Sequence, residues 1–389
     1  MKSIVLKATA AAAFSLLAAG ASAQVKIGLT GALSGSVAVV GQDQVDGFML
    51  ALEQNGGKLG GQPVQVFKED DQLKPDLGNQ IVRKLIDKDK VDAIVGLGFS
   101  NVMMASMKPI VDSRTVAIAT NAGPSPIAGA NCAANAFSMA WPNDSPSEAM
   151  GKFMQEKGYK RVYLMAPNYQ AGKDMLGGFK RYFKGEIVDE VYTQVGQSDY
   201  SSEIAQLQAA NPDAVFAFYP GGMGVNYIRQ LSQAGMLKKL PNYSVFTIDG
   251  TTMPALRDAS VGTYFGAMWD AALDTPENNA FVKAFEAKYK RVPSEYAAAA
   301  YDAARVLDVA IAKMGGKVSD KRAFAAAVKA AGQEFKSVRG PFRFNKNNFP
   351  IQNYYAFQVV SEGGKPVVKQ LGTPLKNHAD IYQPRCRLQ

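Results

Sequence analysis

A glycine-containing turn followed by a serine is the clearest candidate in this sequence for binding a small anion. The apolar run Ala93 to Val95 predicts a buried strand, and Gly96 and Gly98 allow a tight turn after it. Ser100 is then placed to cap a helix that continues through Val102. This arrangement leaves backbone N–H groups free at the carboxyl end of a sheet, where they can bind a carboxylate. An ordinary strand-to-helix turn without a ligand is the alternative.

Residues for nucleophilic or metal chemistry are scarce. The chain contains 1 His, His378, which cannot build a zinc site by itself and belongs to no Ser/His/Asp or Cys/His set. We expect His378 to lie at the surface. The stretch Gly31 to Gly35 lacks the G-x-G-x-x-G spacing of a dinucleotide-binding turn. The sequence therefore argues against an enzyme and predicts neither a cofactor nor a metal site.

The first 23 residues predict export from the cytoplasm. Lys2 and Lys7 give a basic start to an apolar stretch, and Ala21-Ser22-Ala23 is a small-residue cleavage site. We interpret residues 1–23 as a signal peptide that is cleaved after Ala23. No segment is apolar over the length that a membrane-spanning helix needs, so we expect a soluble protein of a bacterial periplasm.

The two cysteines, Cys132 and Cys386, would then meet an oxidising compartment, which favours a disulfide between them. Such a bond would tie the C-terminal tail to the middle of the chain. Two free buried thiols are the alternative.

Length and composition suit a two-domain globular protein. The chain has 389 residues, of which 47% are hydrophobic. Its formal net charge of +9 includes two lysines of the signal peptide, so the mature chain keeps +7. The basic residues are scattered and not interleaved with aromatics, which indicates a solvated surface rather than contact with nucleic acid.

Strands and helices alternate along most of the mature chain, which predicts two α/β halves with parallel sheets. Short apolar runs predict the strands, and apolar residues at helical spacing predict the helices between them. The expected strands span residues 25–29, 64–67, 93–95, 116–119, 137–140, 161–166, 187–192, 214–219, 243–248, 263–269, 342–344 and 354–360. Later helices, at 277–290, 295–314 and from a Ser319 cap to 331, lack strand partners, so we expect them to return to the first half.

Five stretches, in this order and behind an export signal, carry a family resemblance: residues 27–35, Asp70-Asp71, Val95-Gly96 with Ser100, residues 121–124 and residues 169–172. They resemble the type I periplasmic binding proteins of the leucine/isoleucine/valine-binding family. The resemblance implies two Rossmann-like lobes with parallel sheets joined by three hinge crossovers. The lobes would close on a small solute and present it to the membrane permease of an ABC importer.

The resemblance also implies where the lobes and hinges lie. The N-terminal lobe would comprise residues 24–140 and 270–345, and the C-terminal lobe with its tail residues 141–269 and 346–389. Hinges are expected near Trp141, near Trp269 and between Phe344 and Asn353. We expect a monomer.

Position by position, the resemblance places Ser100 and its helix N-terminus on the carboxylate of the ligand. The remaining expected contacts come from both lobes and are Val40, Gly98, Phe99, Asn121, Ala122, Gly123, Asn168, Tyr169, Ala171, Tyr219 and Asp249. In members that bind amino acids, an acid such as Asp249 holds the ammonium group. A simple turn residue is the alternative for Asp249.

The class of ligand stays open between an aromatic carboxylate and a hydrophobic or branched-chain amino acid. Val40, Gly123 and Ala171 stand where amino-acid-binding members carry larger or hydroxyl side chains, which implies a wider pocket. The loop before Cys132, together with a C-terminal Cys, is similar to the branch that takes up aromatic carboxylates, and we favour that class. A ring would stack on Phe99, Trp141, Tyr169 or Tyr219, and Asp249 would accept a hydrogen bond from a ring hydroxyl. A ligand sensor that reports to a membrane receptor is an alternative role for the same fold.

Overall fold

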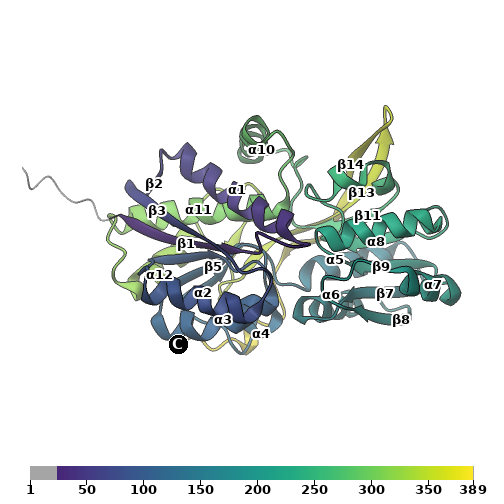
Figure 1. The fold of residues 1–389 in the computed structure, drawn as a ribbon, viewed down its shortest axis with the longest axis horizontal. Coiled ribbons are helices and arrows are strands. Elements are labelled where there is room, and N and C mark those ends of the chain that lie inside the picture. Colours follow the sequence, from purple (N-terminus) through teal and green to yellow (C-terminus); the bar gives the residue numbers. More distant parts are fainter. Residues whose placement is uncertain (1–23, 389) are drawn as a thin grey trace, which may run out of the picture.

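Two α/β lobes lie end to end in the computed structural model, which describes residues 24–388 (Figure 1). The signal peptide predicted for residues 1–23 lies outside the described residues. Each lobe is built on one sheet whose strands are mostly parallel, so the predicted two-lobe α/β fold is confirmed.

The first sheet has the strand order β2-β3-β1-β4-β5-β6, and every pair except β2–β3 is parallel. Its central strands are continuous apolar runs because helices cover both faces. The strands are β1 (Val25–Gly31), β2 (Lys58–Leu59), β3 (Gln62–Asp70), β4 (Ala93–Gly96), β5 (Val116–Ala119) and β6 (Ala136–Ser138). The helices from this part of the chain are α1 (Ala38–Gln54), α2 (Pro75–Asp87), α3 (Ser100–Ser113) and α4 (Ser125–Ala128).

Two later helices return to the first sheet, as predicted. They are α11 (Glu295–Lys313), which packs along α1, and α12 (Lys321–Ala331), which packs against α11 and β5 (Figure 1). The preceding helix, α10 (Pro276–Tyr289), contacts α1.

The second sheet has the strand order β12-β13-β11-β10-β9-β7-β8, with β14 paired to β13. Its strands are β7 (Arg161–Pro167), β8 (Glu186–Thr193), β9 (Ala214–Phe218), β10 (Asn242–Val245), β11 (Tyr264–Ala267), β12 (Arg343–Phe344), β13 (Pro350–Glu362) and β14 (Lys365–His378). Its helices are α5 (Ser145–Glu156), α6 (Gln170–Tyr182), α7 (Ser201–Ala210), α8 (Gly222–Gln233) and α9 (Met253–Leu256). Short 3₁₀ turns span Met236–Lys238, Arg257–Ser260 and Gln383–Arg385.

Two helix starts differ from the expectation. Ser100 is the first helical residue of α3, because the residue in extended conformation before the helix is Phe99. The side chain that caps α12 belongs to Asp320, which accepts from two backbone N–H groups, and not to Ser319. In the first turn of α5, the carboxylate of Glu148 binds Arg181 and His378.

The chain passes between the two sheets after β6, after β11 and between α12 and β13. A fully buried arginine, Arg339, ties the first and third of these passages to α11. Its Nε donates to Asp302 Oδ2 at 3.2 Å, and its Nη1 donates to the carbonyl of Ala140 and to Gln352 Oε1, both at 3.0 Å. These bonds fix the chain where the lobes meet.

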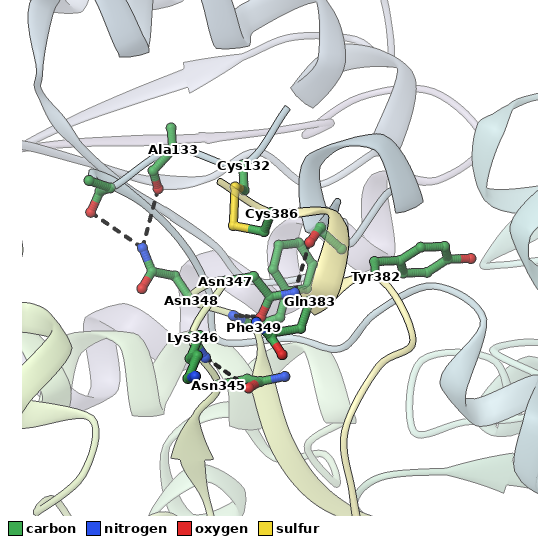
Figure 2. Close-up of a disulfide and its surroundings, with 12 residues drawn as sticks. Cys132, Ala133, Asn345, Lys346, Asn347, Asn348, Phe349, Tyr382, Gln383 and Cys386 are labelled. Carbon is green, nitrogen blue, oxygen red and sulfur yellow. Dashed lines mark hydrogen bonds between the residues drawn. A yellow bond between two sulfur atoms is a disulfide. The ribbon is translucent and has the colours of Figure 1, made fainter. Parts of the chain in front are cut away.

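A disulfide joins Cys132 to Cys386, as predicted, and closes a sequence separation of 254 (Figure 2). It fastens the tail that follows β14 to the loop after α4. Close by, Asn348 Nδ2 donates to the carbonyls of Ala133 and Ala134, so the loop before β13 joins the same cluster (Figure 2).

The expectation of a surface position for His378 is wrong. Its side chain is 13% exposed, and its Nε2 lies 2.5 Å from Glu148 Oε2. The residue ends β14, a strand that the sequence analysis did not predict, and that strand carries it against α5.

Candidate ligand-binding site

A cavity lies where the carboxyl ends of strands from both sheets face each other, the usual position for ligands of α/β folds. It encloses about 270 Å³ between its atoms, a small volume near the lower end of the range for small-molecule sites. Its lining residues are Gly98, Phe99, Ser100, Asn121, Ala122, Trp141, Asn143, Tyr169, Ala171, Met175, Phe218, Pro220, Phe246 and Tyr296.

The polar wall of the cavity is the turn between β4 and α3. Gly96 has a φ of +117°, and a Cβ there would meet the carbonyl oxygen of Thr30 at 1.8 Å, so only glycine fits. No side chain caps α3, which leaves N–H groups of its first turn for another acceptor. Ser100 Oγ accepts from Asn143 Nδ2 at 3.0 Å, so the Ser100 hydroxyl hydrogen remains free to donate. This wall suits an anion.

The opposite walls are aromatic. Trp141 stacks on Phe246 with ring centroids 4.4 Å apart, and Tyr296 lies tilted against Trp141 at 6.1 Å. Beside this pair, Tyr169 stacks on Phe218 at 6.1 Å, and Phe218 meets Phe246 edge-on at 6.2 Å. Burial raises the pKa of Tyr169 and the pKa of Tyr296 above the ordinary value of a tyrosine, so both phenols stay neutral. The result is a continuous aromatic lining beside the polar turn.

None of the residues that line the cavity carries a carboxylate or a cationic side chain. The nearest acid that we expected there, Asp249, is engaged elsewhere. Its Oδ1 accepts from the backbone and hydroxyl of Thr251 at 2.7 and 2.6 Å, and its Oδ2 accepts from the Tyr296 hydroxyl at 3.3 Å. Burial raises the pKa of Asp249 to about 6. Asp249 therefore lies behind Tyr296 and is not a wall of the cavity.

Two hydrogen-bonded contacts hold the lobes together beside the cavity. Asp174, in α6, accepts from the Ser125 backbone at 3.0 Å, from the Ser125 hydroxyl at 2.6 Å and from Asn143 Nδ2 at 2.9 Å. On the other side, the Gly222 N–H donates to the Ser36 carbonyl at 3.0 Å. Ser125 and Ser36 belong to the first lobe, so the structure is that of a closed cleft.

The family profile described as "Periplasmic binding protein" matches residues 24–365. The chain belongs to the periplasmic binding protein family. Members bind solutes for ABC importers and are not enzymes, so the predicted family and the non-enzymatic class are confirmed. A small-molecule ligand and a permease partner are implied for this binding protein by its family.

Relatives of this periplasmic binding protein include ones with known ligands. A Leu/Ile/Val-binding protein homologue of Brucella melitensis is 28% identical over 377 residues, or 92% of this chain and 93% of that one. A solute-binding protein of an R. palustris ABC transporter, solved with benzoate, is 32% identical over 92% of this chain and 98% of its own, with a TM-score of 0.87. Another, from R. palustris BisB5 with 3,4-dihydroxybenzoic acid, is 25% identical over 92% of this chain and 99% of its own, with a TM-score of 0.86.

Seven of the twelve residues expected to contact the ligand line the cavity of this binding protein. They are Gly98, Phe99, Ser100, Asn121, Ala122, Tyr169 and Ala171.

The other five expected residues lie outside the lining. Val40 is buried in α1, and Asn168 is exposed. Tyr219 is fully buried, with its ring against Tyr200 and Tyr227. Gly123 faces the backbone of the first passage between lobes, where a Cβ would meet the Trp141 carbonyl oxygen at 1.7 Å. This close approach explains the glycine without an enlarged pocket. Asp249 is the fifth.

Six lining residues were not among the expected contacts: Asn143, Met175, Phe218, Pro220, Phe246 and Tyr296. The sequence could have indicated Asn143, because this residue follows Trp141-Pro142 at the predicted hinge. A polar side chain at a hinge lies close to both lobes. Tyr296 comes from α11, far along the chain, and only the tertiary fold brings it to the cavity.

Within residues 24–388, no helix combines the length and apolar character needed to cross a bilayer. The same part of the chain contains no group of three or more His, Cys, Asp or Glu side chains placed to hold a metal ion.

Proposed function

We propose that this periplasmic binding protein captures an aromatic carboxylate, such as a benzoate or hydroxybenzoate, and delivers it to an ABC permease. The observation that carries the proposal is the lining of the cavity: aromatic rings on several sides, free donors at the start of α3, and no charged side chain. A flat ring can pack against these aromatic side chains, and its carboxylate can accept from Ser100 and the α3 N-terminus.

A hydrophobic amino acid fits the lining less well. Its ammonium group would need an anionic partner in a site closed to water, because an unpaired buried charge is expensive. Asp249, the residue expected to supply that partner, lies outside the lining and already accepts from Thr251 and Tyr296. Branched-chain amino acids nevertheless remain the second candidate, because several relatives are named Leu/Ile/Val-binding proteins.

The mechanism that we propose is closure of the lobes about their three connections. A ligand held by the first lobe gains its second set of contacts only in the closed form, and so it shifts the population toward that form. We further propose that the mature chain begins at Gln24, acts as a monomer, and reports its closed shape to a permease. A membrane receptor that signals is the alternative partner.

Intrinsic fluorescence tests the ligand class, because Trp141 is one of only 2 tryptophans and lines the cavity. Benzoate and 4-hydroxybenzoate are expected to change the emission at equimolar concentrations, and leucine is not. The Trp141→Phe variant, which keeps Trp269, should lose the signal. A response to leucine or isoleucine without a response to either aromatic acid would overturn the proposal.

A further inference from the structure

A second, larger cavity opens on the first lobe, on the side where the C-terminal tail is fastened. The space within it, which is partly open to solvent, is about 1580 Å³, and it is lined by the end of α3, the loop around Cys132, α12, the loop before β13 and the tail. We call it the tail cavity. Figure 2 shows three of these parts together, with Lys346 and Asn348 beside the disulfide.

All the charged residues that line the tail cavity are cations. They are Arg114, Lys321, Arg322, Lys329, Lys346 and Arg387, and no Asp or Glu belongs to the lining. They come from four separate segments of the chain, so their convergence is a property of the fold. Like charges at one site repel and cost stability unless a counter-charge is bound.

Within residues 24–388, these six cations have no carboxylate partner. None of them takes part in an ion pair within the described residues, although ion pairs occur at many other Lys and Arg residues. Two acids near the cavity are directed elsewhere: Asp112 pairs with Lys108, and Asp320 caps the start of α12. Asp92 is close enough to Lys321 to feel its charge, but it accepts from the backbone of Lys26 and does not line the cavity.

The two inner cations are held by neutral oxygens. Lys321 Nζ donates to the Ser113 carbonyl at 2.9 Å and to Thr115 Oγ1 at 3.0 Å. Lys329 Nζ donates to Asn348 Oδ1 at 2.7 Å and to the Asn345 carbonyl. Burial without a counter-charge lowers the pKa of Lys329 to about 8. Both ammonium groups are therefore oriented by the fold and left without an anion.

We propose that the tail cavity binds a multiply charged oxyanion, a phosphate group above all, at a site separate from the cleft between the lobes. Two lysines fixed by neutral acceptors supply the inner contacts, and the arginines supply planar guanidinium donors that match phosphate geometry. The phosphate can be free in solution or can belong to a lipid headgroup of the membrane that holds the permease. In both cases the group that is bound is a phosphate.

Isothermal titration calorimetry with pyrophosphate, and with inorganic phosphate, tests the free-anion form of this site. The variant Arg114→Gln/Lys346→Gln changes two exposed residues that have no other partner, and it is expected to weaken binding about tenfold or more. Arg322→Gln/Lys329→Gln, which removes two cations of α12, should do the same. Lys68→Gln, an exposed lysine of β3 in the same lobe, is the matched control and should leave the affinity unchanged.

Sedimentation with phosphatidylcholine vesicles, with and without phosphatidylglycerol, tests the lipid form. Binding that requires phosphatidylglycerol and is lost in the same two variants identifies a headgroup as the source of phosphate, whereas binding of pyrophosphate alone identifies a soluble anion. The proposal is overturned if neither arm shows binding, or if Lys68→Gln weakens it as much as the cavity variants. Benzoate binding is measured in parallel and should not change, which separates this site from the cleft.

Discussion

At the residue scale, Ser100 combines two properties that a carboxylate site needs. It is the first residue of an uncapped helix, and its oxygen already accepts from Asn143 at 3.0 Å, which leaves its hydroxyl hydrogen free to donate. Donors that the fold has already oriented cost little to use when the ligand arrives.

Replacing Ser100 with alanine should weaken benzoate binding about tenfold while leaving the fold intact, because one hydrogen bond to a charged group is lost. Calorimetry on the purified variant measures the change. Ser106→Ala is the matched control, since Ser106 is a fully buried serine of the same helix whose hydroxyl has no partner. Equal losses in the two variants would contradict the role of Ser100.

The buried carboxylate of Asp71 should make the free energy of unfolding depend on pH. The residue is 1% exposed, its Oδ1 accepts from the Leu73 N–H at 2.9 Å, and its Oδ2 has no partner. Burial raises its pKa from 3.8 to about 6, so the folded protein holds a proton there that the unfolded chain releases. That contribution to stability is complete below pH 3.8 and is lost as the pH rises to about 6.

The free energy of unfolding of the wild type should therefore fall relative to Asp71→Asn between pH 4 and pH 7, by roughly 2 kcal/mol. Urea unfolding at several pH values measures this difference. Curves for the two proteins that stay parallel over the range would show that Asp71 titrates normally.

At the scale of elements, α4 and α6 meet across the cleft through one carboxylate. Asp174 accepts from both donors of Ser125 and from Asn143, and the two bonds from Ser125 of the first lobe form only when the lobes are closed. No ligand takes part in these bonds. The contact therefore sets how readily the empty protein closes, which in turn scales the apparent affinity.

Asp174→Ala should favour the open form, with a larger radius of gyration in the absence of ligand and a benzoate affinity about tenfold weaker. Small-angle X-ray scattering and calorimetry give the two quantities. Asp112→Ala, which removes an exposed acid of α3, should change neither. An unchanged radius together with an unchanged affinity in Asp174→Ala would refute the role of this contact.

The elements also show how far the sequence could predict the structure. Buried parallel strands such as β4 and β5 are short apolar runs, and their predicted bounds lie close to the observed ones. The long strand β14 was missed because Lys365–His378 is rich in lysine and contains glycine and proline, and its pairing depends on β13 alone. In the site, residues in loops that follow predicted strands could be predicted from the sequence. Tyr296 and Phe246 could not, because only the tertiary arrangement brings them to the cavity.

At the scale of the whole molecule, the C-terminal tail links both lobes. β14 belongs to the second sheet, whereas Cys386 is bonded to Cys132 in the first lobe. Between them, Tyr382 packs in the core of the first lobe and donates to Asp144 Oδ2 at 2.7 Å, beside α5. The tail is thus a strap across the connection between the lobes.

Removing the disulfide by Cys132→Ser/Cys386→Ser should lower the melting temperature, with a loss of about 2–5 kcal/mol in the free energy of unfolding, because a long loop is released in the unfolded chain. Differential scanning calorimetry measures the effect, and reduced wild type should match the variant. A melting temperature that reduction leaves unchanged would show that the bond does not contribute to stability.

Calorimetric titration of residues 24–389 with benzoate, benzamide and leucine separates the contributions of the ring, the carboxylate and the ammonium group. Benzoate and benzamide share a ring and differ in the negative charge, whereas benzoate and leucine share a carboxylate and differ in the ammonium group. We expect tight 1:1 binding of benzoate, much weaker binding of benzamide, and no binding of leucine. Tight binding of leucine without binding of benzoate would show that the cleft does not select aromatic carboxylates.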